Sequence, residues 1–273
     1  MANTDPVYIS INNSAPAVLA VMSGLESQRA KQAAAISQRS KLPRNLFLAG
    51  LPFVGLDWLL GYNFLTFSLV TAGLWGAALA IRRGLARARP GNAFPAHFNT
   101  SREVIHTLRD DPDPRRNLFG HVDLTGAQQP AKRFREGTNA AGRAMEYFRD
   151  EWLSLKLKLY DGNMLRLSAI ERVKVRKSYY KRSAISGKMK LKPAKLASAQ
   201  QLKVRLSVNP LVYEIAERGN LKVGGGVGQF AFTQVSTAGG IIDVTADSTL
   251  RIVPPKEILG LLRLVYDQLQ RKA

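Results

Sequence analysis

Apolar and polar positions alternate in the second half of the chain, a pattern typical of strands with one buried face. Every second residue of 153–159 is leucine, and the alternation resumes over 165–169. The intervening Asp-Gly-Asn sequence at 161–163 predicts a β-hairpin. A three-residue loop would pair Leu159 with Leu165 and keep the leucines on one face. A two-residue Asp-Gly loop would instead mix apolar and charged side chains, so we expect the longer loop.

The same alternation continues in three further segments, 172–176, 188–192 and 202–208. If these strands share one sheet, one of its faces is aliphatic and the other is basic. The basic face would carry Lys156, Lys158, Arg166, Arg172, Lys174, Arg176, Lys188, Lys190, Lys192, Lys203 and Arg205. Like charges opposite one another across strands are destabilising, so such a face favours an anionic partner. The alternative is a solvated lysine-rich face that prevents aggregation at sheet edges.

The longest apolar stretch spans residues 46–81 and contains one formal charge, Asp57. Because one membrane crossing needs about 20 residues, the stretch predicts two helices, near 46–60 and 64–81, joined by a turn at 61–63. We therefore expect a transmembrane helical hairpin. Both helices are slightly short, so a re-entrant hairpin is an alternative, as is a buried hairpin of a domain outside the membrane.

Basic residues flank this stretch, with Lys41 and Arg44 before it. The basic juxtamembrane residues after it are Arg82, Arg83, Arg87 and Arg89. Basic residues at both ends favour cytoplasmic placement of both ends. We therefore expect an integral membrane protein, suited to a bacterial inner membrane, with both termini cytoplasmic.

Small residues recur on the second predicted helix at Ala72, Gly76 and Ala80. Such a stripe permits close contact between helices. The partner would be either the other helix of the hairpin or a neighbouring subunit, so a homo-oligomer is possible.

The remaining segments complete the expected organisation. Residues 1–45 form an N-terminal segment with an amphipathic helix over 16–38, and residues 82–137 form a basic connector with one short helix at 101–109. Residues 138–273 form a soluble β-rich domain that opens with a helix at 138–150 and ends with an amphipathic helix after Pro254-Pro255. The expected fold class is an α+β membrane protein, a transmembrane hairpin followed by a mostly antiparallel β domain with a C-terminal amphipathic helix.

Composition restricts the chemistry. The 273 residues contain 40 Lys and Arg against 20 Asp and Glu, a net charge of +20, and no cysteine. A disulfide-stapled domain, a cysteine zinc site and a cysteine nucleophile are therefore excluded. His97, His106 and His121 lack the spacing of metal ligands, and Asp243 and Asp247 are typical of a turn or solvent role at a strand end. We expect no enzyme activity and no cofactor.

Three functions remain open. The first is a membrane-anchored binding or scaffold protein whose basic sheet face docks an anionic lipid surface or an acidic protein. The second is a membrane-associated nucleic-acid-binding protein, in which Tyr179 and Tyr180 stack on bases. The third is a subunit of an oligomeric membrane assembly or pore.

Overall fold

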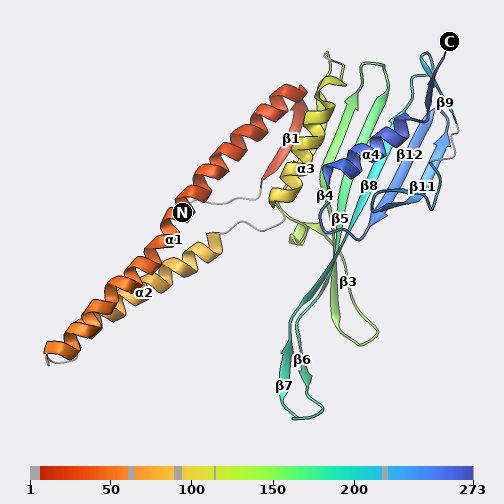
Figure 1. Cartoon of the computed structure of the whole chain (residues 1–273). Coiled ribbons are helices and arrows are strands. Elements are labelled where there is room, and N and C mark those ends of the chain that lie inside the picture. Colours follow the sequence, from red (N-terminus) through yellow and green to blue (C-terminus); the bar gives the residue numbers. More distant parts are fainter. Residues whose placement is uncertain (1–6, 61–64, 89–93, 114, 217–220, 273) are drawn as a thin grey trace. The chain divides into compact units, whose positions relative to one another are not determined.

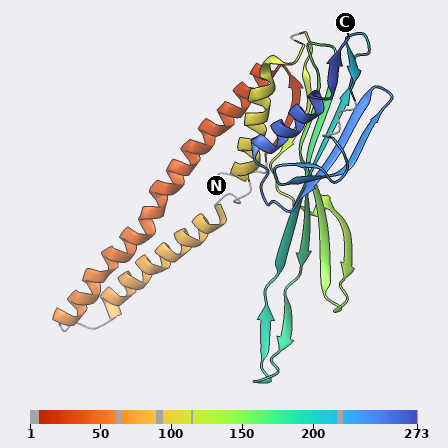
Figure 2. The same cartoon turned by 45° about the vertical axis from the view of Figure 1, so that its right-hand side comes forward.

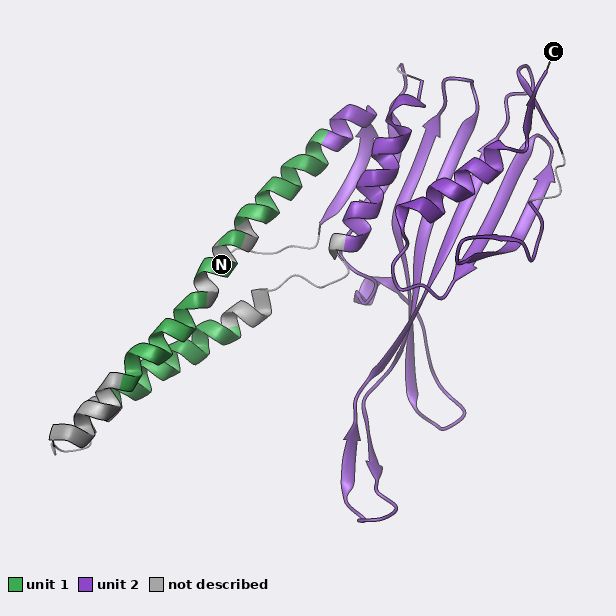
Figure 3. Cartoon of the chain, viewed as in Figure 1, with its two compact units in different colours: residues 1–4, 20–91 green, residues 5–19, 92–273 purple. Residues whose placement is uncertain are grey.

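A computed structural model describes residues 7–60, 65–88, 94–113, 115–216 and 221–272. Within these ranges, the side chains of 32–33, 35–36, 39–40, 52–60, 65–68, 84–88 and 94–95 are not described. The chain divides into two compact units (Figure 3). Unit 1 comprises residues 1–4 and 20–91, and unit 2 comprises residues 5–19 and 92–273.

Unit 1 consists of two helices. Most of α1 (Ala15–Leu60) belongs to it, together with α2 (Leu65–Ala88). The helices meet through aromatic and small residues. The Phe47 and Trp75 rings stack with centroids 4.8 Å apart, and the Trp75 indole donates a hydrogen bond to the Phe47 carbonyl. One turn away, the buried Thr71 hydroxyl lies 3.5 Å from the Gly50 carbonyl. A single α1 replaces the separate helices expected at 16–38 and 46–60.

The transmembrane expectation is wrong. Over the described residues, neither long helix offers an apolar stretch sufficient to cross a membrane. The apolar residues are divided between two helices that both continue into charged sequence. Lys41 and Arg44 lie inside α1, and Arg82 and Arg83 lie inside α2. This finding overturns the membrane fold class, the transmembrane hairpin and the integral-membrane localisation with cytoplasmic termini.

Unit 2 is built on a large antiparallel sheet (Figure 1). Its strands, in spatial order, are β1 (Tyr8–Asn13), β2 (Leu118–Asp123), β4 (Ala144–Lys158), β5 (Met164–Arg176), β8 (Lys195–Ser207), β12 (Ile241–Ser248), β11 (Phe230–Ala238) and β10 (Gly226–Val227). The additional strand β3 (Arg133–Thr138) pairs with the first half of β4. Two small antiparallel pairs stand apart, β6 (Tyr179–Arg182) with β7 (Met189–Lys192), and β9 (Tyr213–Ile215) with β13 (Leu269–Arg271).

Two helices cover one face of the sheet, α3 (Phe94–Thr107) and α4 (Pro255–Tyr266) (Figure 2). Two short 3-10 helices also occur, at Leu108–Asp110 directly after α3 and at Pro130–Lys132 before β3. The covered face holds the core, because alternate residues of β4, β5, β8 and β12 turn their side chains beneath the helices. The fully buried members include Leu155, Leu157, Leu165, Leu167, Leu202, Val204, Ile242 and Val244. The expected C-terminal helix is α4, whose apolar stripe supplies Ile258, Leu261 and Val265 to this core.

The register of the β4–β5 hairpin differs from the expectation by two residues. Leu157 pairs with Leu165, rather than Leu159 with Leu165. Five residues therefore form the connection, in which the Leu159 amide donates to the Asn163 carbonyl. Leu159 instead forms a bridge with Pro112. A shift of two positions keeps every side chain on its expected face, because strands have a period of two.

The helix expected at 101–109 is present but begins earlier, since α3 starts at Phe94 and a 3-10 turn continues to Asp110. Three other expectations are wrong. The connector contains β2 and β3 in addition to the expected helix. The helix expected at 138–150 is replaced by the end of β3 and the start of β4. The segment 188–192 belongs to the β6–β7 pair and not to the large sheet.

Candidate functional site

The face of the large sheet opposite α3 and α4 is the principal candidate site, and we call it the open face. Among the described residues of unit 2, no helix covers it (Figures 1 and 2). The registers place eight of the predicted basic residues on it: Lys156, Lys158, Arg166, Arg172, Lys174, Arg176, Lys203 and Arg205. They occupy β4, β5 and β8, three adjacent strands. The same registers add Arg149 and Lys195, which the sequence interpretation missed.

The densest charge lies in one row across these strands. Lys156 pairs with Arg166, and Arg166 pairs with Arg205, so three cationic residues are direct cross-strand neighbours. Directly opposite side chains in a sheet are about 5 Å apart at Cβ. All three residues are exposed. The row therefore concentrates positive charge at a cost in stability, which an anion bound over it would offset.

A second group lies farther along β5. Arg149 pairs with Arg172, and the next pair on this face is Tyr147 with Lys174. The Lys174 ammonium lies 5.6 Å from the centroid of the Tyr147 ring, within range of a cation–π contact. Arg172 donates a hydrogen bond of 2.7 Å to the side-chain oxygen Oε1 of Gln201, which fixes its guanidinium over the middle of the sheet.

Aromatic rings flank the cationic row on β1 and β2. Phe119 pairs directly with Lys156, and His121 follows on the same face of β2. The Tyr8 ring on β1 stacks on His121 with centroids 5.3 Å apart. Tyr8 is 58% exposed and Phe119 48% exposed, large values for aromatic residues. The sequence interpretation missed these rings because it placed neither β1 nor β2 in the sheet.

Carboxylate side chains on β12 border the basic residues of the open face on the side away from β1 and β2. Asp243 and Asp247 lie on the open face of β12, Asp247 one residue from the end of the strand and Asp243 nearer its start. Arg205 Nη1 is 3.9 Å from Asp243 Oδ2, and Gln201 donates a 2.8 Å hydrogen bond to Asp247 Oδ1. The basic residues therefore form a stripe along β4, β5 and β8, which does not extend across the whole sheet and which Glu151 interrupts on β4.

The other predicted site residues lie elsewhere. Lys188, Lys190 and Lys192 are exposed on or beside β7, away from the large sheet. Arg82 and Arg83 are exposed on α2, whereas the Arg87 side chain and Arg89 lie outside the described residues. Ala72, Gly76 and Ala80 are also exposed on α2. Since α1 and α2 meet through Thr71 and Trp75 instead, contact of the small-residue stripe with a neighbouring subunit stays a prediction.

A buried ionic cluster joins the end of β2, the middle of β4 and the 3-10 turn at Pro130–Lys132. The Lys132 ammonium is 2.8 Å from Asp123 Oδ2 and 2.7 Å from Asp150 Oδ1. It also donates to the Thr125 hydroxyl and the Gly126 carbonyl. Burial raises the pKa of Asp150 above its ordinary value despite Lys132. Asp123 is also desolvated, but hydrogen bonds from Lys132 and Thr125 bring its pKa below the ordinary value.

A second buried cluster joins α3 to the sheet. His97 Nε2 is 3.4 Å from Glu171 Oε2, and the His97 ring stacks on Trp152 with centroids 4.4 Å apart. Burial tends to raise the pKa of Glu171, but hydrogen bonds from His97 and Ser198 outweigh it and lower this pKa. Trp152 is fully buried, and its indole donates to Gln200. Because these groups are buried, we assign them to the packing of α3 and not to contact with an external substrate.

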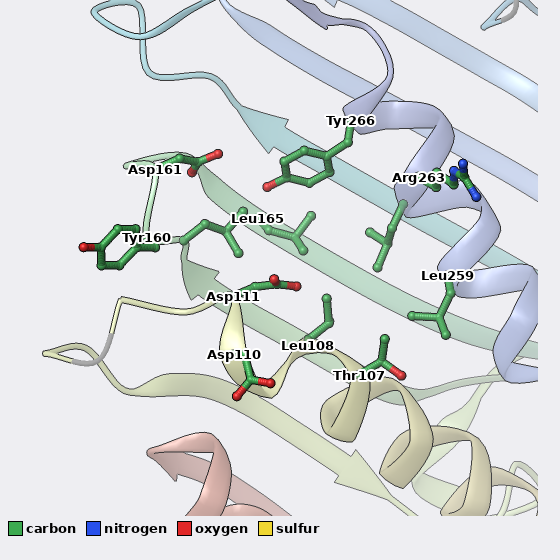
Figure 4. A pocket seen from close by; sticks show the side chains of 12 residues that line it. Thr107, Leu108, Asp110, Asp111, Tyr160, Asp161, Leu165, Leu259, Arg263 and Tyr266 are labelled. Atoms are coloured by element: carbon green, nitrogen blue, oxygen red, sulfur yellow. The ribbon is translucent and has the colours of Figure 1, made fainter. Parts of the chain in front are cut away.

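A cavity of about 540 Å³ lies between α3, α4 and the β4–β5 connection (Figure 4). Five leucines and two tyrosines line it, together with Arg263 and three carboxylates, those of Asp110, Asp111 and Asp161. Burial, together with the neighbouring Asp110 and Asp161, raises the pKa of Asp111. The negative groups at this cavity distinguish it from the open face and disfavour anionic ligands there.

The chain matches no protein-family model, no curated protein and no solved structure.

Proposed function

We propose that this chain is a binding protein whose open face docks a single-stranded nucleic acid. The observation that carries this proposal is the adjacency of a cationic row and a line of rings. Lys156, Arg166 and Arg205 cross three strands, and Phe119, beside Lys156, continues to His121 and Tyr8. Proteins that bind single strands combine cationic grooves for phosphates with exposed aromatic rings on which bases stack.

The shape of the charged area favours a narrow polymer over an extended anionic surface. Asp243 and Asp247 border the stripe on β12. An anionic plane laid over the whole face would meet these carboxylates and also Glu151, which lies on the open face of β4 opposite Ile170. A narrow chain following β5 and β8 would avoid all three. The stripe runs the length of β5, and its 13 residues extend over about 40 Å.

The aromatic component favours nucleic acid over an acidic protein. Carboxylates would satisfy the lysines and arginines, but they give no reason for Tyr8 and Phe119 to stay more than 45% exposed beside them. Unpaired bases present flat π faces of the kind that stack on such rings. An acidic protein partner is therefore the competing occupant that the experiment must separate.

The test is fluorescence anisotropy of the full chain with a labelled oligothymidylate, with labelled oligouridylate and labelled polyglutamate as comparisons. We expect micromolar or tighter binding to an oligonucleotide, weakening steeply with salt because phosphate contacts release counterions. Phe119→Ala should lower oligonucleotide affinity by about fivefold or more, as expected for the loss of one base stack. Arg166→Gln should lower affinity and reduce the salt slope by about one.

Lys256→Gln is the matched charge control, because Lys256 is exposed on α4, on the helix-covered side. It should leave the affinity within about twofold of the parent, since it removes no phosphate contact on the open face. Absence of oligonucleotide binding at low salt would overturn the proposal. Equal binding of polyglutamate, with no effect of Phe119→Ala, would instead identify an acidic protein as the partner.

A further inference from the structure

The β6–β7 pair forms an arm at one end of the large sheet, and we call residues 177–195 the ribbon (Figures 1 and 2). It is a direct extension of β5 and β8. The last pair of those strands is Arg176 with Lys195, and the first pair of the ribbon, three residues farther on each strand, is Tyr179 with Lys192. A ligand lying along the stripe of the open face would therefore reach the ribbon without changing strands.

The ribbon has two chemically different sides. Its pairing places Tyr180 beside Leu191, and Arg182 beside Met189, on one side. The other side carries Lys181 opposite Lys190, and Lys192 opposite Tyr179. The first side is thus largely apolar and the second is cationic, because neighbouring strand residues point to opposite faces.

The apolar side is exposed. Tyr180 is 67% exposed, and Met189 and Leu191 are each more than half exposed. Ile185, at the tip, is fully exposed. Large apolar residues gathered on one exposed side mark an interaction surface. At the base, the Tyr179 ring lies under the guanidinium groups of Arg143 and Arg176, at 4.2 and 5.0 Å, and this contact orients the ribbon.

The charge of the ribbon restricts the kind of partner that it can bind. Residues 177–195 contain the basic residues Lys177, Lys181, Arg182, Lys188, Lys190, Lys192 and Lys195, and no acidic residue. A second ribbon would therefore be repelled, which excludes pairing of two copies through this surface. The occupant must be anionic and must also offer apolar or planar surfaces.

We propose that the ribbon is a second contact for the nucleic-acid strand docked on the open face. An unpaired base stacks on Tyr180, with Leu191 and Met189 packing at its edges, while Arg182 on the same side of the ribbon contacts a phosphate. This inference rests on the proposed function, and it adds that the binding site extends beyond the sheet. It predicts that the binding affinity depends on the length of the oligonucleotide, since only a longer strand reaches both the open face and the ribbon.

The test compares short and long oligothymidylates in anisotropy titrations of the full chain. In the parent, the long strand should bind at least about tenfold more tightly than the short one, because the second contact becomes intramolecular. Tyr180→Ser should reduce long-strand affinity by about fivefold or more and leave short-strand affinity unchanged. Tyr180→Phe keeps the ring and should retain the affinity for both strands. The exposure of Tyr180 makes the fold tolerant of both substitutions.

Two results would overturn the inference, and they differ from failure of the proposed function. If Arg166→Gln weakens binding while Tyr180→Ser has no effect on the long strand, the open face binds nucleic acid without the ribbon. If Tyr180→Ser abolishes binding to phosphatidylglycerol vesicles but not to the long strand, the ribbon contacts lipid instead. Absence of binding by either strand to the parent would remove the proposed function itself.

Discussion

Charged side chains on the two faces of the large sheet differ in the contacts that they make. Away from the open face, the Lys132 ammonium contacts the carboxylates of Asp123 and Asp150, and Glu171 is hydrogen-bonded to His97 and Ser198. On the open face, Lys156 and Arg166 are direct neighbours of like charge, and neither forms an ion pair with another described residue. Burial makes an unpaired charge costly, whereas solvent makes a row of like charges tolerable. The covered face therefore stabilises the fold, and the open face is available for binding.

The largest effect should come from breaking the buried cluster with Lys132→Met. Removing the ammonium leaves Asp123 and Asp150 buried near each other without compensation, which should cost about 3 kcal/mol of unfolding free energy. Urea denaturation followed by circular dichroism measures this cost. Asp150→Asn is the matched control and should cost less, because Lys132 keeps its contact with Asp123. Equal costs for the two variants would contradict the assignment of Lys132 as the central charge.

An intermediate effect should appear in the pH dependence of stability through Glu171. Its pKa in the folded chain lies below the ordinary value of 4.5. Its stabilising contribution is therefore fully present above that value and is lost as the pH falls through the lower folded pKa. The stability difference between the parent and Glu171→Gln should shrink as the pH falls below about 4.5. Urea unfolding of both chains over a pH series measures it, and a pH-independent difference would contradict this role.

The smallest effect on stability should come from Arg166→Gln on the open face. This substitution removes the central member of the row with Lys156 and Arg205, so stability should stay unchanged or rise by about 0.2–1 kcal/mol. Oligonucleotide affinity should fall in the same variant. A gain or no change in stability with a loss of binding would separate the two faces experimentally. A loss of more than about 1 kcal/mol would show that Arg166 has a structural role.

Part of the binding surface could be predicted from the sequence because strand periodicity is a local property. Alternation over 153–159 and 165–169 was enough to assign Lys156 and Arg166 to one face, even though the predicted register was two residues off. The lysines of 188–192 alternate in the same way, yet they belong to the ribbon. Alternation assigns a side of a strand, but it does not say which sheet the strand joins.

Other parts of the molecule were not predicted because their signals are weak or ambiguous. The segments that form β1 and β2 contain polar residues and glycine, and they become strands because β2 pairs with β4 and β1 pairs with β2. Residues 144–150 have no strict alternation, and pairing with β3 and β5 makes them a strand. The apolar stretch 46–81 predicted membrane crossings, but it is shared between two helices that also contain charged residues, and no crossing helix occurs in the described part of the chain.

The sequence alone determined the excess of positive charge, the lack of cysteine, the alternating strands and the amphipathic C-terminal helix, because each depends on composition or on neighbouring residues. Only the tertiary structure decided what lies together. It set Phe119 beside Lys156, aligned Lys156, Arg166 and Arg205 in one row, and extended β5 and β8 into the ribbon. The physical reason is that strand pairing joins residues far apart in the chain, so no local pattern specifies which side chains become neighbours.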